Sequence, residues 1–192
     1  MHSTRKAAPV RTLRAGLSAL VGATLLLVVL PGTAGAATAS TTTTFTLTGG
    51  SISISVPSTT VNFGAVSVSA GSITARLGTI TVHDGRGLLN GSWTSTVSAS
   101  HFTTGGQTAA ETINATGVSY WSGAATATSG VGTLLGSQLT SGLAVVINAA
   151  QTAFTGGSLI GNNSASWNPT LITTPSAAVV GTYTGTVTHT VA

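Results

Sequence analysis

The chain has 192 residues, no cysteine, six Lys/Arg and two Asp/Glu, which gives a formal net charge of +4 at pH 7. Four of the six cations lie before residue 15, so the remainder holds two positive and two negative side chains. Because no Lys/Arg cluster follows, the composition argues against nucleic-acid binding and against a polybasic membrane patch. The lack of cysteine excludes thiol catalysis and disulfides, so stability must come from packing and backbone pairing.

Residues 1–36 have the three-part build of a secretory signal peptide. A basic start is followed by the apolar run 15–30 and by the small residues Ala34-Gly35-Ala36. This run is shorter than the roughly 20 apolar residues that a membrane span needs. We expect cleavage after Ala36, with Ala39 as the alternative site, and a secreted product with no membrane association after cleavage. Residues 37–44 contain only Ala, Thr and Ser and are predicted to be a flexible leader.

Residues 45–192 are predicted to form one all-β domain. Thr, Ser, Val and Ile are abundant, and apolar and polar residues alternate with period two in stretches such as 51–56 and 182–191. Short strands separated by Gly and Pro at this spacing favour an antiparallel β-sandwich over a barrel. The expected strands lie near 45–48, 51–56, 61–68, 72–83, 92–99, 117–121, 144–155, 164–172 and 181–191.

The breaks between these strands are expected at turn-forming residues, among them Gly156-Gly157 and Asn168-Pro169. The segment 129–142 is rich in Gly, Ser and Thr and is predicted to be a long loop or an irregular edge. Helix has little support, and 107–116 and 134–146 are the only candidates for short pieces.

Catalytic residue types are scarce. Asp84 and Glu111 are the only acids, they lie 27 positions apart, and Asp84 belongs to an Asp-Gly-Arg-Gly stretch in which Asp is expected to stabilise a turn. His83, His101 and His189 are scattered and fit no metal-ligand or Ser-His-Asp pattern. The sequence therefore predicts a protein that is not an enzyme, with no metal and no cofactor.

The aromatic residues are the better candidates for function. Exposed Trp can stack on sugar rings, but a Trp packed between two sheets is the commoner arrangement. Trp93, Tyr120 and Trp121 are candidate ligand-binding residues, and Trp121 is the most exposed candidate because strand neighbours point to opposite faces. Trp167 and Asp84 are assigned structural roles. Tyr183 opens a strand after a loop and resembles a tyrosine corner.

Three stretches resemble the WxL-type domain of secreted Gram-positive surface proteins. These are 80–87 followed by Gly91-Ser92-Trp93, then 166–175, and the closing 180–188. The resemblance implies an Ig-like β-sandwich, export, and non-covalent attachment to peptidoglycan, with Trp93 as the one signature residue that carries over. The chain departs from the family at Ser95, where the family has Leu, and at His189, where it has a second Trp.

Two functions follow as hypotheses. The first is a secreted cell-surface protein that binds the cell wall, through peptidoglycan or another wall glycan, by neutral polar and aromatic contacts. The second is a structural or adhesive module that self-associates or binds other surface proteins, since nearly chargeless edge strands lack the usual protection against pairing.

Overall fold

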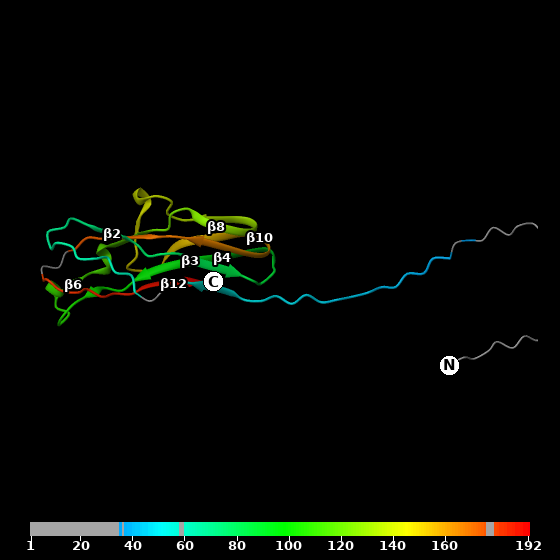
Figure 1. Ribbon diagram of the computed structural model, residues 1–192, viewed down its shortest axis with the longest axis horizontal. Coiled ribbons are helices and arrows are strands. Elements are labelled where there is room, and N and C mark those ends of the chain that lie inside the picture. The colour runs from blue at the N-terminus through cyan, green and yellow to red at the C-terminus, as the bar shows by residue number, and fades with distance from the viewer. Residues whose placement is uncertain (1–34, 36, 58–59, 176–178) are drawn as a thin grey trace, which may run out of the picture. The chain divides into compact units, whose positions relative to one another are not determined.

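The computed structural model describes residues 35, 37–57, 60–175 and 179–192 (Figure 1). The chain divides into a unit Met1–Thr44 and a compact unit Phe45–Ala192. The predicted signal peptide falls almost wholly outside the described residues, and the predicted leader 37–44 contains no helix or strand.

The compact unit is built from antiparallel strands, which confirms the predicted all-β sandwich without disulfides. Short 3-10 helices lie at η1 (Ala109–Glu111), η2 (Ala115–Gly117) and η3 (Ser141–Leu143), where the sequence suggested short helical pieces at 107–116 and 134–146. The strands are β1 (Ile52–Ser55), β2 (Ile73–Arg76), β3 (Ile80–Asp84), β4 (Leu89–Ala99), β5 (Phe102–Thr103), β6 (Thr112–Ile113), β7 (Val118–Trp121), β8 (Ala125–Gly136), β9 (Val145–Val146), β10 (Gln151–Trp167), β11 (Thr170–Thr173) and β12 (Val187–Val191).

The larger sheet is organised around the 17-residue strand β10. Strand β8 pairs along one side of β10, while β3 and β4 pair end to end along its other side. Strands β1 and β12 complete the sheet by pairing with β3 and β4 respectively. The central position of β10 explains its length, because both of its edges find backbone partners over most of their extent.

The smaller sheet has the order β2-β11-β7-β9 and is made largely by continuations of the same strands. The chain passes from β2 to β3, from β7 to β8 and from β10 to β11, and each passage changes sheets. The bend is held where the Leu77 amide donates to the Pro169 carbonyl at 2.9 Å. Gly78 lies next to this contact with a φ of +89°, a conformation that glycine adopts without strain. Strands that bend from one sheet into the next close the corner of a sandwich.

The core has two apolar clusters. The first joins the smaller sheet to β4 and β10, and the second lies against β3, β4 and β10. The first contains Leu77, Val97, Val118, Tyr120, Ile147, Ala153 and Leu171. The second contains Ile80, Val82, Trp93, Phe154, Leu159, Ala165 and Trp167.

The predicted break at Gly156-Gly157 is wrong, since both residues lie inside β10. The reason is packing: a Cβ on Gly156 would come within 2.6 Å of the Trp93 indole, so glycine leaves room for that ring. The predicted break at Asn168-Pro169 is confirmed and separates β10 from β11.

The sequence left two predictions for 129–142, a long loop or an irregular edge, and the irregular edge is confirmed over residues 129–136, where β8 pairs with β10. Glycines in β8 take positive φ at positions where the register shifts, so the segment is an irregular strand rather than a loop. Conversely, the described residues of the expected strands 45–48 and 61–68 form no strand. Turn chemistry prevails at 62–64, because the Gly64 amide donates to the Asn62 side chain at 2.8 Å.

Within the described part of the chain, no helix has the length and apolar character that crossing a membrane requires.

Candidate functional site

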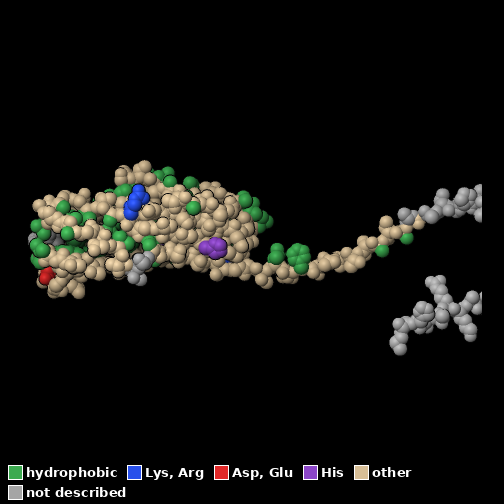
Figure 2. All heavy atoms as spheres, viewed as in Figure 1, with side chains coloured by type: hydrophobic (Ala, Val, Ile, Leu, Met, Phe, Trp, Pro, Cys, Tyr) green, Lys and Arg blue, Asp and Glu red, His purple; other side chains and the backbone are tan. Residues whose placement is uncertain are grey.

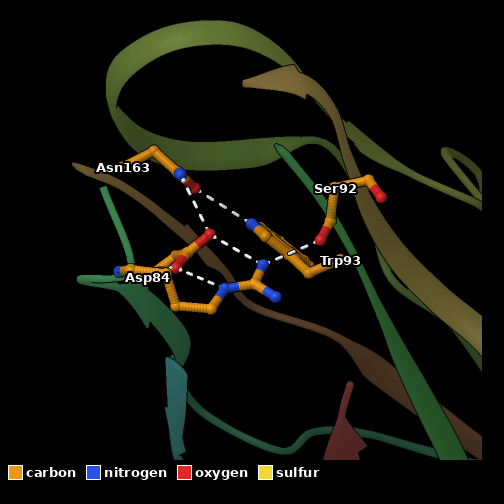
Figure 3. Close-up of polar contacts among 5 residues, drawn as sticks. Asp84, Ser92, Trp93 and Asn163 are labelled. Carbon is orange, nitrogen blue, oxygen red and sulfur yellow. Dashed lines mark hydrogen bonds and ion pairs between the residues drawn. The ribbon is translucent and has the colours of Figure 1, made fainter. Parts of the chain in front are cut away.

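A chain of polar contacts links the turn after β3 to the interior (Figure 3). The Arg86 guanidinium donates to both carboxylate oxygens of Asp84, at 2.8 and 2.9 Å, and to the Ser92 carbonyl at 2.7 Å. The Asn163 amide donates to Asp84 at 3.3 Å and accepts from the Trp93 indole at 2.9 Å. The buried polar side-chain atoms of Asp84, Trp93 and Asn163 are therefore paired through these contacts.

Asp84 is 2% exposed and its charge is held by donors on several sides. Hydrogen bonds from the Arg86 side chain are the main cause that lowers its pKa to about 2, and the Arg86 amide and Asn163 add to the effect against the opposing cost of burial. Arg86, two residues along the chain, thus holds the Asp84 carboxylate in its ionised form. These are the contacts of a residue that stabilises a turn, which is the role predicted for Asp84 from the sequence.

Trp93 is 2% exposed, which corrects the expectation that it contacts a ligand. Its ring stacks on Phe154, which in turn stacks on Trp167 with ring centroids 4.6 Å apart. The physical reason is the inward face that Trp93 shares with Ser95 and Val97 in β4.

Tyr120 is fully buried, which corrects its assignment as a ligand-binding residue in the same way. Its hydroxyl accepts from the Trp167 indole at 3.0 Å and lies 3.3 Å from Nε2 of His189. Burial raises the pKa of Tyr120 and lowers that of His189 to about 4, so both groups are neutral at pH 7. Trp167, Tyr120 and His189 thus tie the two sheets together.

Trp121 is the one tryptophan of the three that stays partly exposed. It points to the outer face of the smaller sheet, opposite to its neighbour Tyr120, as period two requires. Across the strands its register partners are Thr170 and then Arg76. This face keeps one aromatic surface accessible from solution.

Tyr183 has the contact of a tyrosine corner. Its hydroxyl donates to the Val179 carbonyl, four residues upstream, at 2.8 Å. The contact lies in the connection that leads into β12.

The other acid, Glu111, caps η1. Its carboxylate accepts from the Thr108 amide at 3.0 Å and from the Thr108 hydroxyl at 2.8 Å, and these bonds lower its pKa. Asp84 and Glu111 are thus engaged in separate local structures, and no group of three or more His, Cys, Asp or Glu residues able to hold a metal ion lies within residues 37–57, 60–175 and 179–192.

Strand β8 is an edge strand of 12 residues, most of which are exposed. It has hydrogen-bonded pairing to β10 on one side, and within the described residues no strand pairs on its other side. The strand Ala125–Gly136 contains no charged residue and no proline. Val131 and Leu135 are 60% and 54% exposed. Natural edge strands usually carry charge, proline or irregularity, and here only the glycine irregularities are present.

No protein-family model, no curated protein and no solved structure matches this chain. The arguments about function therefore start from the geometry of its own residues.

Two features of the site escaped the sequence reasoning. Asn163 was not singled out, although it shares period two with Ala165 and Trp167 and so occupies an inward position where a polar residue needs a partner. The second feature is the pairing of β8 with β10, because glycines and the lack of a regular apolar pattern left a loop and an irregular edge as equal predictions for 129–142.

Proposed function

We propose that this protein is a secreted, non-enzymatic module that acts outside the cell through neutral strand-edge contact, pairing with further copies of itself or with a surface protein. The observation that carries the proposal is the uncharged, exposed edge of β8. Backbone donors and acceptors along such an edge are satisfied when another strand adds to the sheet. The signal peptide predicted at residues 1–36, almost all of which lie outside the described residues, supports the extracellular part of the proposal.

Self-association is tested with the chain from residue 37 by sedimentation velocity over a wide concentration range. We expect reversible dimers, and a Thr128→Lys variant to weaken association about fivefold or more, because twofold pairing brings like charges close together. Thr94→Lys is the matched control: it adds the same charge to an exposed position of β4, which has partners on both sides. A wild-type chain that stays monomeric at every concentration contradicts self-pairing and leaves a partner protein as the target.

The partly exposed Trp121 favours a second candidate function, binding to peptidoglycan or another wall glycan. Since Trp93 and Tyr120 are buried, Trp121 is the candidate that can stack on a sugar ring. The resemblance to WxL-type domains of Gram-positive surface proteins also points to the cell wall. We expect co-sedimentation with purified peptidoglycan that Trp121→Ala reduces severalfold while the melting temperature changes little. Protein that remains in the supernatant would count against wall binding.

A further inference from the structure

A cavity of about 800 Å³ opens between the two sheets. Its walls include inward residues of β2, β11 and β12 and the segments 60–68 and 179–186. Figure 2 shows hydrophobic side chains gathered around a hollow at the end of the domain where Figure 1 labels β2 and β6. Pockets that bind small molecules commonly have volumes of about 300–1,000 Å³, so this cavity is in the range of a ligand site.

The described lining of the cavity contains no Asp, Glu, Lys or Arg. Apolar side chains dominate it, among them Phe63, Ile73, Leu77, Phe102 and Val187. Transfer of an unpaired charge into such surroundings is strongly unfavourable. The lining therefore selects for an uncharged ligand with a large apolar part.

Thr173 places an unpaired hydroxyl on this lining. It is 5% exposed and shares the inward side of β11 with Leu171, by the alternation of the strand. Its Oγ1 is buried and makes no hydrogen bond within the described residues. Buried hydroxyls are normally paired, so an unpaired one on a cavity wall indicates a missing partner.

His189 supplies a second polar group on the lining. The Trp167 indole can only donate, so the Tyr120 oxygen accepts from it and the Tyr120 proton is available to Nε2 of His189. In this arrangement the neutral ring carries its proton on Nδ1, which makes no hydrogen bond to any described residue. Burial lowers the pKa of His189 to about 4, which keeps the ring neutral at pH 7.

We propose that the cavity between the sheets binds a neutral, mainly apolar molecule with one oxygen-containing polar group, of the class of medium-chain alcohols, whose oxygen contacts Thr173 and His189. The apolar lining takes the hydrocarbon part. The Thr173 hydroxyl, which has no partner among the described residues, meets the oxygen, and the His189 ring on the same lining offers the second polar contact. This inference does not depend on strand-edge pairing, because the cavity is lined by β2, β11 and β12 and not by β8.

The test uses the chain from residue 37 at pH 7.5 and the fluorescence of 1,6-diphenyl-1,3,5-hexatriene, a hydrocarbon that reports an apolar site. The probe is displaced by 1-decanol, decanoate or decylammonium, each below the concentration at which it aggregates. We expect 1-decanol to compete at least tenfold better than either ion. Absence of probe binding to the folded protein, or displacement by an ion that equals that by 1-decanol, would overturn the proposal.

The polar contacts are tested with Thr173→Val and Thr170→Val. Both threonines lie in β11 and are 5% exposed, but only Thr173 lines the cavity. We expect Thr173→Val to lower the affinity for 1-decanol roughly fivefold, because it removes about one neutral hydrogen bond. The affinity for the hydrocarbon probe should stay unchanged. Thr170→Val should change neither affinity. His189→Phe should act like Thr173→Val. If Thr173→Val leaves 1-decanol affinity unchanged, the assigned contact is wrong.

Discussion

The ion pair between Asp84 and Arg86 is a partly buried polar contact in a domain that has few charged residues. The carboxylate is 2% exposed, yet each oxygen accepts from the guanidinium, and Asn163 adds a further donor. Removal of one partner from such a pair leaves the other without its counter-charge, which costs more than the net value of the pair. The turn, the start of β4 and the edge of the second apolar cluster are therefore coupled through this residue.

Asp84→Asn is expected to destabilise the domain by about 2 kcal/mol at pH 7 and to remove part of its acid sensitivity. The pKa of Asp84 falls from 3.8 to about 2 on folding. Because the folded-state pKa is the lower one, the stabilisation is present above about pH 4 and is lost as the pH falls through about 2. Urea unfolding at pH 7 and at several values between pH 5 and 2 measures both effects.

Glu111→Gln is the matched control for the loss of a carboxylate, since Glu111 lies on the surface and its carboxylate bonds only to the nearby residues Gly106 and Thr108. It should change stability far less than Asp84→Asn. An Asp84→Asn variant whose stability falls with acid as steeply as that of the wild type between pH 4 and 2 would contradict the assignment.

The hydrogen bond of the Trp93 indole nitrogen can be tested separately from the packing of the Trp93 ring. Trp93→Phe keeps an aromatic ring beside Phe154 but removes the donor to Asn163, whose buried oxygen then has no partner. We expect a loss of about 1–3 kcal/mol in the free energy of unfolding, measured by urea titration. Trp121→Phe, at the partly exposed position, should cost much less, and equal losses in the two variants would argue against the buried hydrogen bond.

At the scale of elements, β8 owes its shape to glycines that permit register shifts without breaking the strand. Gly130 has a φ of +89°, and a Cβ there would lie 2.5 Å from the Asn162 carbonyl oxygen. Gly161 in β10 also has positive φ, at +70°, but a Cβ there would meet no atom within 4 Å. A comparison of alanine substitutions at these two glycines therefore separates the cost of a positive φ from the cost of a steric clash.

Gly161→Ala is expected to cost about 1–2 kcal/mol, the penalty for a left-handed residue with a side chain. Gly130→Ala should cost more, because the clash with the neighbouring backbone adds to the same penalty. Thermal or urea unfolding of both variants gives the comparison. Equal costs would show that β8 moves away from β10 freely enough to remove the clash.

The sequence predicts a strand correctly where a local alternation of residues marks it. It does not predict features that depend on which distant strands pair with each other. The alternation in 51–56 and the Tyr120-Trp121 neighbours led to the correct strands and to the correct exposed face. For 129–142 the sequence could not choose between a loop and an irregular edge, because composition cannot show that a glycine-rich segment has β10 beside it. The ligand-binding assignment of Trp93 failed for a related reason: a strand pattern says which residues share a face, and only the pairing of the sheets says which face is covered.

At the scale of the whole molecule, the charge balance makes a prediction about association. The compact unit has two cations and two anions, and Asp84 and Arg86 neutralise each other within it. Pairing through β8 should therefore change little between about 0.05 and 0.5 M salt, because salt screens charge interactions but not backbone pairing. Sedimentation velocity at both salt concentrations measures it, and a strong salt dependence would indicate contact through charged groups instead.

The passage of strands from one sheet to the other also sets an order of assembly. Strands β10 and β11, at residues 151–173, lie at the centre of both sheets, so neither sheet has its middle strand until this late stretch of chain is available. A chain synthesised from its N-terminus thus cannot complete either sheet before this stretch is available. We therefore expect the two sheets to be completed only after β10 and β11 have been synthesised, because their pairings with β2, β3 and β4 join residues far apart in the sequence.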